Sequence, residues 1–387
     1  MLWVKKTKKI TPIPSGIERK LLQNAYNKQP NNKTFFTKLI ESHLHESSLD
    51  DAIKVCEKHL DTVAKSDYVF ASLIQIYRKL NDIENLIQIA ELAISHHPKI
   101  DTQLHLACAY AHKNQLDIAH TLMPNNDDFI AMDVSLLRLA LQTYLLIKQP
   151  QKATDLYSTL SKQKQSDSGL KSDYIKALAL LDKQTELAKL LDYSSLIKQY
   201  QLYAVNESLP IKMVNDVLSD FLSSHSKQFF EPGNHTAKCG SQMHFETNWH
   251  TYLYDLEEQI KPIAERYLEN SALLEAATKH SFTIHFWANV LNQGGHQISH
   301  IHPDALLSGV YYLKVPKSIS RNPKKNNYQG CLLFKQDKTD PYYIQPKDGL
   351  LVLFPSYFYH QTIPLKHHES RVCIAFDVVK ENTAKTI

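Results

Sequence analysis

The stretch HIHPDALLSGVYYL, residues 300–313, decides how the C-terminal half of this chain folds. Its second half is apolar, aromatic and rich in residues that favour β-strands. In an extended chain, residues two apart project to the same side, so His300 and His302 can reach one metal ion together. The stretch therefore predicts a β-strand that begins just after a pair of metal-binding side chains.

Further strand-like segments surround this stretch on both sides. They are FTIHFWANV at 282–290, GCLLF at 330–334, GLLVLFP at 349–355 and RVCIAFD at 371–377. His360 and Arg371 stand at the ends of two of these segments. An all-β domain of the barrel or jelly-roll kind would gather such residues at one mouth.

Three histidines form the candidate metal site. His300 and His302 supply two ligands, and His360 supplies a third from a distant strand. Such a set leaves the opposite face of the metal open, as in the non-heme Fe(II) oxygenases. Two alternatives stay open. The histidines are solvent-facing loop residues in a chain that has 20 of them, or Asp304 replaces His302 as the second ligand.

In this order and spacing the motifs resemble one family. They are His-x-His-Pro, Leu-Ser-Gly-Val-Tyr-Tyr-Leu, Gly-x-Leu-x-Leu-Phe-Pro-Ser, His-x-Thr-x-Pro and Arg-x-x-Ile-Ala-Phe-Asp. Together they look like the 2-oxoglutarate/Fe(II)-dependent oxygenases that are often fused to tetratricopeptide repeats, and more distantly like prolyl hydroxylases. The resemblance covers roughly residues 230–380. It implies a double-stranded β-helix that uses Fe(II), 2-oxoglutarate as cosubstrate and O₂.

The resemblance also implies roles for other residues. Arg371, whose planar fork suits a carboxylate, would hold the far end of 2-oxoglutarate, and Tyr312 would add a hydroxyl. Trp287 and Asn289 are pocket candidates, with core packing as the alternative for Trp287. The chain departs from the His-x-Asp of most of the superfamily, and Cys373 stands where many relatives carry a hydroxyl. A three-histidine site keeps open a cupin-like oxygenase that needs no 2-oxoglutarate.

Before about residue 230 the sequence is poor in glycine and shows a repeat. Tyr77, Tyr110 and Tyr144 are spaced 33 and 34 residues apart, with polar turns after each. Each period predicts two short amphipathic helices, and the pattern resembles tetratricopeptide repeats (TPR) without their usual Trp and turn Gly. A second series of small or apolar residues follows the same period: Ala52, Leu86, Ala119, Ala153 and Ala188.

We therefore expect an α+β chain of two domains. The first is an N-terminal all-α helical-repeat solenoid (TPR-like), and the second is a C-terminal double-stranded β-helix (jelly-roll) with supporting helices, one of them over about 249–277. The expected boundaries are 1–34 for an N-terminal tail and lead-in, 35–200 for the repeats, 201–229 for a linking helix, 230–380 for the oxygenase domain and 381–387 for a C-terminal tail.

Composition argues against several classes of partner. The formal net charge is +4 and the basic residues are dispersed along the chain, a pattern that does not indicate nucleic-acid binding. No apolar run approaches the roughly 18 residues of a transmembrane helix, and lysines interrupt the start where a signal peptide would be apolar. Five widely separated cysteines suit a reducing compartment. We expect a cytoplasmic protein without a nucleic-acid or membrane partner.

The sequence thus predicts a 2-oxoglutarate- and Fe(II)-dependent dioxygenase that hydroxylates a protein or peptide side chain presented by the repeats. One alternative is a small-molecule hydroxylase of the same chemistry. Another is a non-catalytic TPR interaction protein with a degenerate oxygenase domain. The repeats could also serve as a homodimerisation platform or as a rigid cap on the enzyme.

Overall fold

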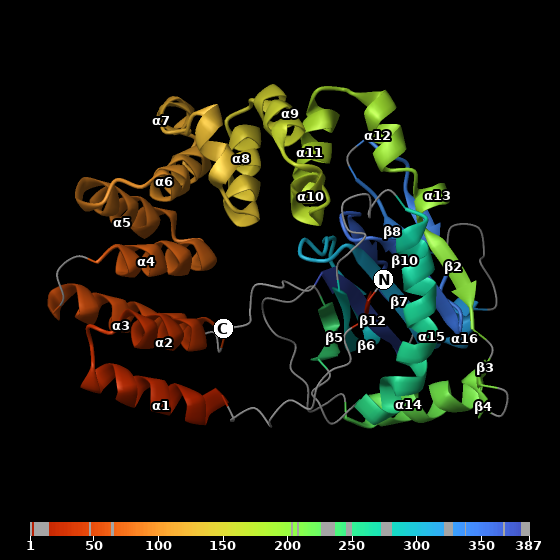
Figure 1. The fold of residues 1–387 in the computed structure, drawn as a ribbon. Coiled ribbons are helices and arrows are strands. Elements are labelled where there is room, and N and C mark those ends of the chain that lie inside the picture. Colours follow the sequence, from red (N-terminus) through yellow and green to blue (C-terminus); the bar gives the residue numbers. More distant parts are fainter. Residues whose placement is uncertain are drawn as a thin grey trace. The chain divides into compact units, whose positions relative to one another are not determined.

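The computed structural model describes residues 2–3, 15–45, 48–62, 66–202, 204–206, 209–225, 237–244, 250–271, 281–320, 328–336, 338–366 and 368–380. The chain divides into two compact units, Lys6–Ser158, and Met1–Lys5 together with Thr159–Ile387. The first is helical and the second contains the β-sheets (Figure 1). Among the described helices, none is long and apolar enough to cross a membrane.

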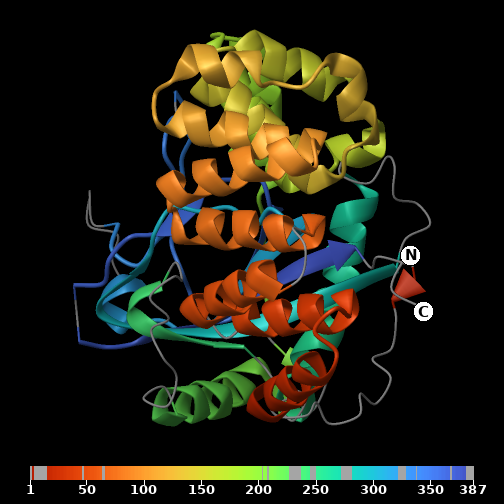
Figure 2. The same ribbon diagram turned by 90° about the vertical axis from the view of Figure 1, so that its left-hand side faces the viewer.

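The helical unit stacks short helices in chain order (Figure 2). Pairs of helices joined by tight turns bury their apolar faces against their neighbours, as helical repeats do. This confirms the predicted helical-repeat architecture, and the predicted lead-in 1–34 contains a helix. The helices are α1 (Ser15–Lys28), α2 (Lys33–His45), α3 (Leu49–Thr62), α4 (Asp67–Leu80), α5 (Ile83–His96), α6 (Ile100–His112), α7 (Leu116–Thr121), the 3₁₀-helix η1 (Asn126–Ala131), α8 (Val134–Leu146) and α9 (Pro150–Thr159).

The turn inside each pair recurs with the predicted period. One residue adopts a positive φ of 56–60°, a conformation that Asn and Asp tolerate better than other non-glycine residues. The next backbone N–H then donates to the carbonyl five residues back, which closes the helix end. Three of these acceptors are the predicted tyrosine series. The turn residues are Asn81, Asn114, Lys148 and Asp182, and the acceptors are Tyr77, Tyr110, Tyr144 and Leu178.

The second residue series is confirmed at four of its five positions. Ala52, Leu86, Ala119 and Ala153 are all buried. The prediction was wrong at Ala188, which is exposed, whereas its neighbour Leu187 is buried. The position of the turn explains this difference, because it sets which side chain of the following helix faces inward. Each buried residue after a turn lies five residues beyond the positive-φ residue: Leu86, Ala119, Ala153 and Leu187.

The second unit carries two sheets. The larger has the strand order β1-β6-β12-β7-β10-β2, with β5 also paired to β6, and the smaller has the order β11-β8-β9. The larger sheet consists of β1 (Leu2–Trp3), β2 (Lys198–Gln201), β5 (Ala237–His244), β6 (Ser281–Gln297), β7 (Leu307–Lys314), β10 (Leu350–Pro355) and β12 (Arg371–Lys380). The smaller consists of β8 (Leu332–Phe334), β9 (Tyr342–Ile344) and β11 (His360–Thr362), and a separate pair is β3 (Ala204–Asn206) with β4 (Leu209–Pro210).

The inner faces of the two sheets pack against each other. Phe334 on β8 meets Phe354 on β10 with ring centroids 4.9 Å apart. Glycine is required at 309 on β7, because a Cβ there would lie 2.2 Å from the ring of Phe376 on β12. Two sheets that are antiparallel except for the short β1 pack face to face and form the predicted jelly-roll.

Helices cover the outer face of the larger sheet (Figure 1). They include α14 (Ile211–His225) and α15 (His250–Glu269). The Tyr311 hydroxyl of β7 donates to Asn215 of α14 at 2.9 Å. The helix expected over 249–277 is confirmed as α15. The linking helix expected over 201–229 begins only at Ile211 as α14, after the strands β3 and β4.

The last helices of the segment predicted as repeats, 35–200, belong to the sheet-containing unit, and one strand was not predicted from the sequence. Helices α10 (Lys162–Gln165), α11 (Ser168–Leu180), α12 (Gln184–Leu190) and α13 (Tyr193–Leu196) belong to the sheet-containing unit. After them β2, with the polar sequence KQYQ, pairs antiparallel with β10, Leu350 opposite Gln201. An edge strand with one polar face carries no strong apolar alternation, so its sequence resembles a loop.

Candidate metal centre

The three predicted histidines lie together at one end of the sheets. Each offers a ring nitrogen, and these atoms lie within 4.8 Å of one another in His300, His302 and His360. The ring centroids of His300 and His360 are 4.3 Å apart. Their backbones exchange two hydrogen bonds of 3.0 and 3.1 Å, which fix the loop before β7 against β11. Histidines from two distant chain segments are thus held close enough to serve one metal ion.

Hydrogen bonds orient all three rings in the same way. Nδ1 of His300 bonds to the carbonyl of Ile298 at 2.7 Å, and Nδ1 of His360 to that of Phe358 at 3.0 Å. A carbonyl only accepts, so Nδ1 carries the proton and Nε2 keeps a free lone pair. That tautomer is the one expected of a histidine that binds a metal through Nε2.

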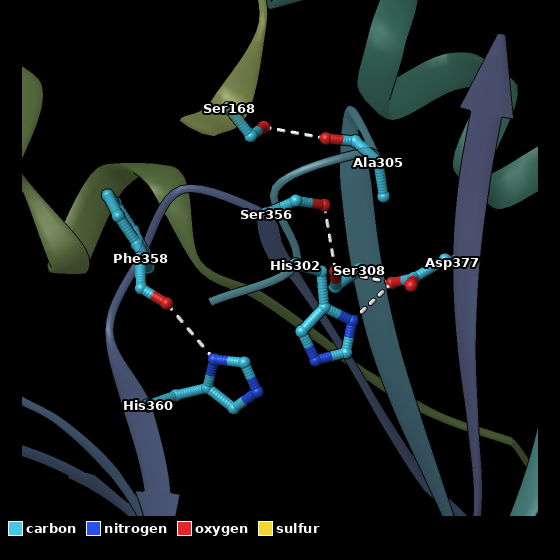
Figure 3. Close-up of polar contacts among 8 residues, drawn as sticks. All are labelled: Ser168, His302, Ala305, Ser308, Ser356, Phe358, His360 and Asp377. Carbon is cyan, nitrogen blue, oxygen red and sulfur yellow. Dashed lines mark hydrogen bonds and ion pairs between the residues drawn. The ribbon is translucent and has the colours of Figure 1, made fainter. Parts of the chain in front are cut away.

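The third ring is oriented by a carboxylate. His302 Nδ1 lies 2.6 Å from Asp377 Oδ1 on β12, and the Ser308 hydroxyl donates to the same oxygen at 2.7 Å. Ser308 also bonds to the Ser356 hydroxyl at 2.7 Å, and the His302 backbone N–H donates to the Ser356 carbonyl at 3.0 Å (Figure 3). Carboxylate–histidine–metal arrangements of this kind strengthen the ligand and hold its ring.

Sequence reasoning missed Asp377 as a site residue. A signal existed, because Asp377 is the one acidic residue of RVCIAFD, and strand alternation places it on the face of Arg371. Only the pairing of β12 with β7, Asp377 opposite Ser308, brings it to His302.

Helix α11 braces the loop that carries His302. The Ser168 hydroxyl donates to the Ala305 carbonyl at 2.6 Å, and the Gly169 N–H donates to the Pro303 carbonyl at 3.3 Å. The loop before His360 is braced similarly, since the Tyr357 hydroxyl donates to the Leu190 carbonyl at 3.0 Å. The helices at the start of this unit therefore help to position two of the histidines (Figure 3).

Asp304, the alternative ligand, lies outside the histidine group. Its side chain is exposed, and within the described chain the group of close ligand atoms comprises the three histidines alone. The turn from His302 to Ala305, closed by a 3.2 Å backbone hydrogen bond, directs the two side chains differently. The geometry favours His302 over Asp304.

Burial sets the protonation of two of the histidines. Burial, with a smaller effect of the neighbouring His302, lowers the pKa of His300 to about 4. Burial also holds the pKa of His360 well below its usual range, with both other histidines acting in the same direction. The rings of His300 and His360 are therefore neutral near pH 7, which is the form that binds a metal.

Arg371 is buried close to this centre, and no acidic side chain among the described residues forms an ion pair with it. Its side chain is 1% exposed, and one terminal NH₂ group donates to the Thr362 hydroxyl at 3.2 Å. Its Nε has no hydrogen-bond partner among the described residues. Thr362 follows His360 by two residues on β11, about 6.6 Å along an extended strand. Thr362 and His360 project to the same face of β11, so the guanidinium that bonds to Thr362 lies on the side of the strand that carries His360.

Tyr312 lies against Arg371. The guanidinium carbon is 4.8 Å from the centre of the tyrosine ring, and the hydroxyl has no hydrogen-bond partner among the described residues. Burial raises the pKa of Tyr312 to about 12, and the charge of Arg371 opposes that rise. Buried polar atoms without partners are costly, so Arg371 and Tyr312 together fit the carboxylate of a bound ligand.

The two pocket candidates lie on the inner face of β6. The Trp287 ring centroid is 5.6 Å from that of His302, so this tryptophan borders the histidines. Asn289 is 1% exposed, and its Oδ1 has no partner in the described chain. Asn289 and Tyr312 pair with Cys373 from either side, which puts all three in one row across the sheet.

Comparisons with known proteins agree with this site. Residues 285–377 match the model of the family described as "Putative 2OG-Fe(II) oxygenase". That segment holds all three histidines, Arg371 and Asp377, and the match confirms the resemblance drawn from the sequence motifs. The curated proteins include no match to this chain.

Several solved structures are similar to parts of this chain. A prolyl-4-hydroxylase from Pseudomonas putida is 14% identical, with a TM-score of 0.37 over 49% of this chain and 96% of that one. A prolyl hydroxylase from Trichoplax adhaerens, in complex with a hypoxia inducible factor peptide fragment, is 16% identical, with a TM-score of 0.36 over 51% and 91%. A TPR protein from Thermus thermophilus is 16% identical, with a TM-score of 0.35 over 42% and 90%.

Proposed function

We propose that this protein is a 2-oxoglutarate- and Fe(II)-dependent dioxygenase. The observation that carries the proposal is a buried arginine that has no acidic partner among the described residues and lies on the face of β11 that carries one of three converging histidines. A buried charge without a counter-charge is strongly unfavourable. An anionic ligand that also reaches the metal would supply the missing partner.

The side chains of this site suit both Fe(II) and 2-oxoglutarate. His300, His302 and His360 would hold Fe(II) through Nε2, while Arg371 and Tyr312 would bind the far carboxylate of 2-oxoglutarate. Bound Fe(II) with 2-oxoglutarate supplies O₂ activation for oxidation of a substrate C–H bond. The chain's own contribution is to fix the rings, keep those of His300 and His360 neutral and enclose the cosubstrate away from water.

Asp377 compensates for the missing carboxylate ligand. Most of the superfamily places an acid directly on the metal, whereas here the acid is one hydrogen bond away, behind His302. The short bond transfers part of the negative charge to the imidazole and raises its basicity as a ligand. A three-histidine site with this support remains suited to a divalent iron.

We propose further that the substrate is a protein or peptide side chain. The support is the helical-repeat unit, because arrays of this kind commonly bind extended polypeptides. A small-molecule hydroxylase of the same chemistry is the alternative. An assay against a peptide library and a metabolite library in parallel separates the two.

Succinate formation tests the proposed chemistry. With Fe(II), O₂ and ascorbate, the wild-type protein should convert 2-oxoglutarate slowly to succinate even without substrate. Arg371→Met should abolish conversion at low 2-oxoglutarate, and it should stabilise the protein because an unpaired buried charge is removed. Arg266→Met, on helix α15, is the matched control. Equal succinate formation by Arg371→Met and wild type would contradict the proposal.

A further inference from the structure

A pocket of about 150 Å³ lies on the outer face of the smaller sheet. Two of the residues that line it are Leu333 of β8 and Gln361 of β11, which are opposite each other in the sheet. His360, the residue before Gln361, faces inward, because its ring centroid is 4.7 Å from that of Phe354 in the facing sheet. Alternation along the strands therefore directs the side chains of Gln361 and Leu333 outward, where the pocket lies.

Ser299 lines the same pocket from the loop that carries the first histidine. His300 and His360 form an antiparallel bridge, so Ser299 lies opposite Gln361. The Ser299 hydroxyl and the Gln361 carboxamide are therefore neighbours on the outward face, since residues opposite each other in paired segments share a face. The pocket is bounded by residues adjacent in sequence to two of the three histidines, and it lies on the other side of the sheet from the cosubstrate site.

Lys335 supplies the charge of this pocket. Its backbone N–H donates to the Tyr359 carbonyl at 3.3 Å, which extends the pairing of β8 with β11 by one residue beyond Phe334. Lys335 therefore shares the outward face with Leu333, two residues earlier, and it lines the pocket. Its side chain is exposed, and among the described residues no acidic side chain forms an ion pair with it.

We propose that this pocket is a subsite for a carboxylate of the substrate. The Lys335 ammonium, the Ser299 hydroxyl and the Gln361 carboxamide are donors, and none of them bonds to another side chain in the described chain. A carboxylate accepts through both of its oxygens, and its single charge balances that of one lysine. The inference rests on the proposed function, because it takes the occupant to be part of the substrate, and it narrows the substrate class to acidic molecules. The carboxylate belongs either to an Asp or Glu side chain of a peptide or to a small organic acid.

Binding of small probes to the full-length, metal-free protein tests the subsite, with saturation-transfer NMR as the readout. The probes are N-acetyl-glutamate N-methylamide, its uncharged glutamine analogue, and glutarate as a free acid. The glutamate probe should bind, and the glutamine probe should bind about tenfold more weakly. Binding of glutarate alone, with the dependence on Lys335 described below, would assign the carboxylate to a small organic acid and support the same subsite. Equal binding of the glutamate and glutamine probes, or no binding of any probe, would overturn the proposal.

Lys335→Gln is the decisive variant, with the exposed Lys347→Gln as its matched control. Loss of the charge should weaken binding of the acidic probe about tenfold, at an unchanged melting temperature because the side chain is exposed. Arg371→Met, which alters the cosubstrate site on the inner face, should bind the glutamate probe as wild type does. Undiminished binding by Lys335→Gln, or binding that only Arg371→Met abolishes, would overturn the proposal. These readouts need neither iron nor turnover, so they fail independently of the dioxygenase activity.

Discussion

At the scale of single residues, the centre depends on atoms that the motifs do not identify. His300, His302 and Arg371 could be predicted because strand alternation and resemblance both point to them. Asp377 could not, because its role appears only when β12 and β7 are in register. The unpaired Nε of Arg371 is likewise a property of the folded interior and not of any motif.

Asp377→Asn should weaken iron binding by about 10–100-fold, since it removes the charge behind His302 but keeps the shape. Competition with a fluorescent chelator measures the Fe(II) affinity under anaerobic conditions. Asp340→Asn, at an exposed position of the same unit, serves as the control. An unchanged affinity in Asp377→Asn would mean that this carboxylate does not support the ligand.

Substitutions also distinguish His302 from Asp304 as the second metal ligand. His302→Ala should lose stoichiometric Fe(II), whereas Asp304→Ala should keep it, because Asp304 lies outside the histidine group. Iron is counted in the purified proteins after anaerobic loading and gel filtration. The reverse result would assign the ligand to Asp304 and require the loop to rearrange when metal binds.

At the scale of elements, period and alternation predicted most helices and strands, and the two failures have separate causes. The repeat period could be read from Tyr77, Tyr110 and Tyr144, but Ala188 was assigned one position too far. The turn residue, not the spacing of small residues, sets the inward face. β2 was missed because an edge strand needs few apolar residues.

Lys148 offers a test of that turn. It adopts φ 59°, a conformation that costs a lysine energy and a glycine almost none. Lys148→Gly should therefore stabilise the helical unit by about 0.5–1 kcal/mol, after the entropy cost of glycine. Urea unfolding followed by circular dichroism measures this. Lys58→Gly, on the exposed side of α3, should destabilise by about 1 kcal/mol; stabilisation by both would point to an effect on the unfolded state alone.

At the scale of the whole molecule, the chain combines a helical-repeat unit with a jelly-roll unit, and a buried histidine should make the helical unit sensitive to acid. His105 in the helical unit has its pKa lowered to about 4, mainly by burial and also by Arg78. The unfolded chain binds this proton near pH 6.5. Stability is therefore full above pH 6.5 and falls as the pH drops toward 4.

In His105→Leu the free energy of unfolding should depend less on pH, and its loss between pH 7 and pH 4 should be smaller by on the order of 3 kcal/mol. Unfolding of the helical unit at pH 7, 5.5 and 4.5 gives the slope. The exposed His112→Leu is the matched control. An identical slope in His105→Leu and wild type would show that the acid sensitivity arises elsewhere.

The central claim is that Arg371 and the three histidines bind 2-oxoglutarate and Fe(II) as one site. Its most direct test is an anaerobic titration of the metal-free protein with Fe(II) and then 2-oxoglutarate, followed through the weak visible charge-transfer band of the iron–keto acid chelate. The band should appear in wild type, vanish in His360→Ala and require far more 2-oxoglutarate in Arg371→Ala. Iron bound without any band would contradict the claim and indicate an oxygenase independent of 2-oxoglutarate, and no bound iron would indicate a repeat-based binding protein.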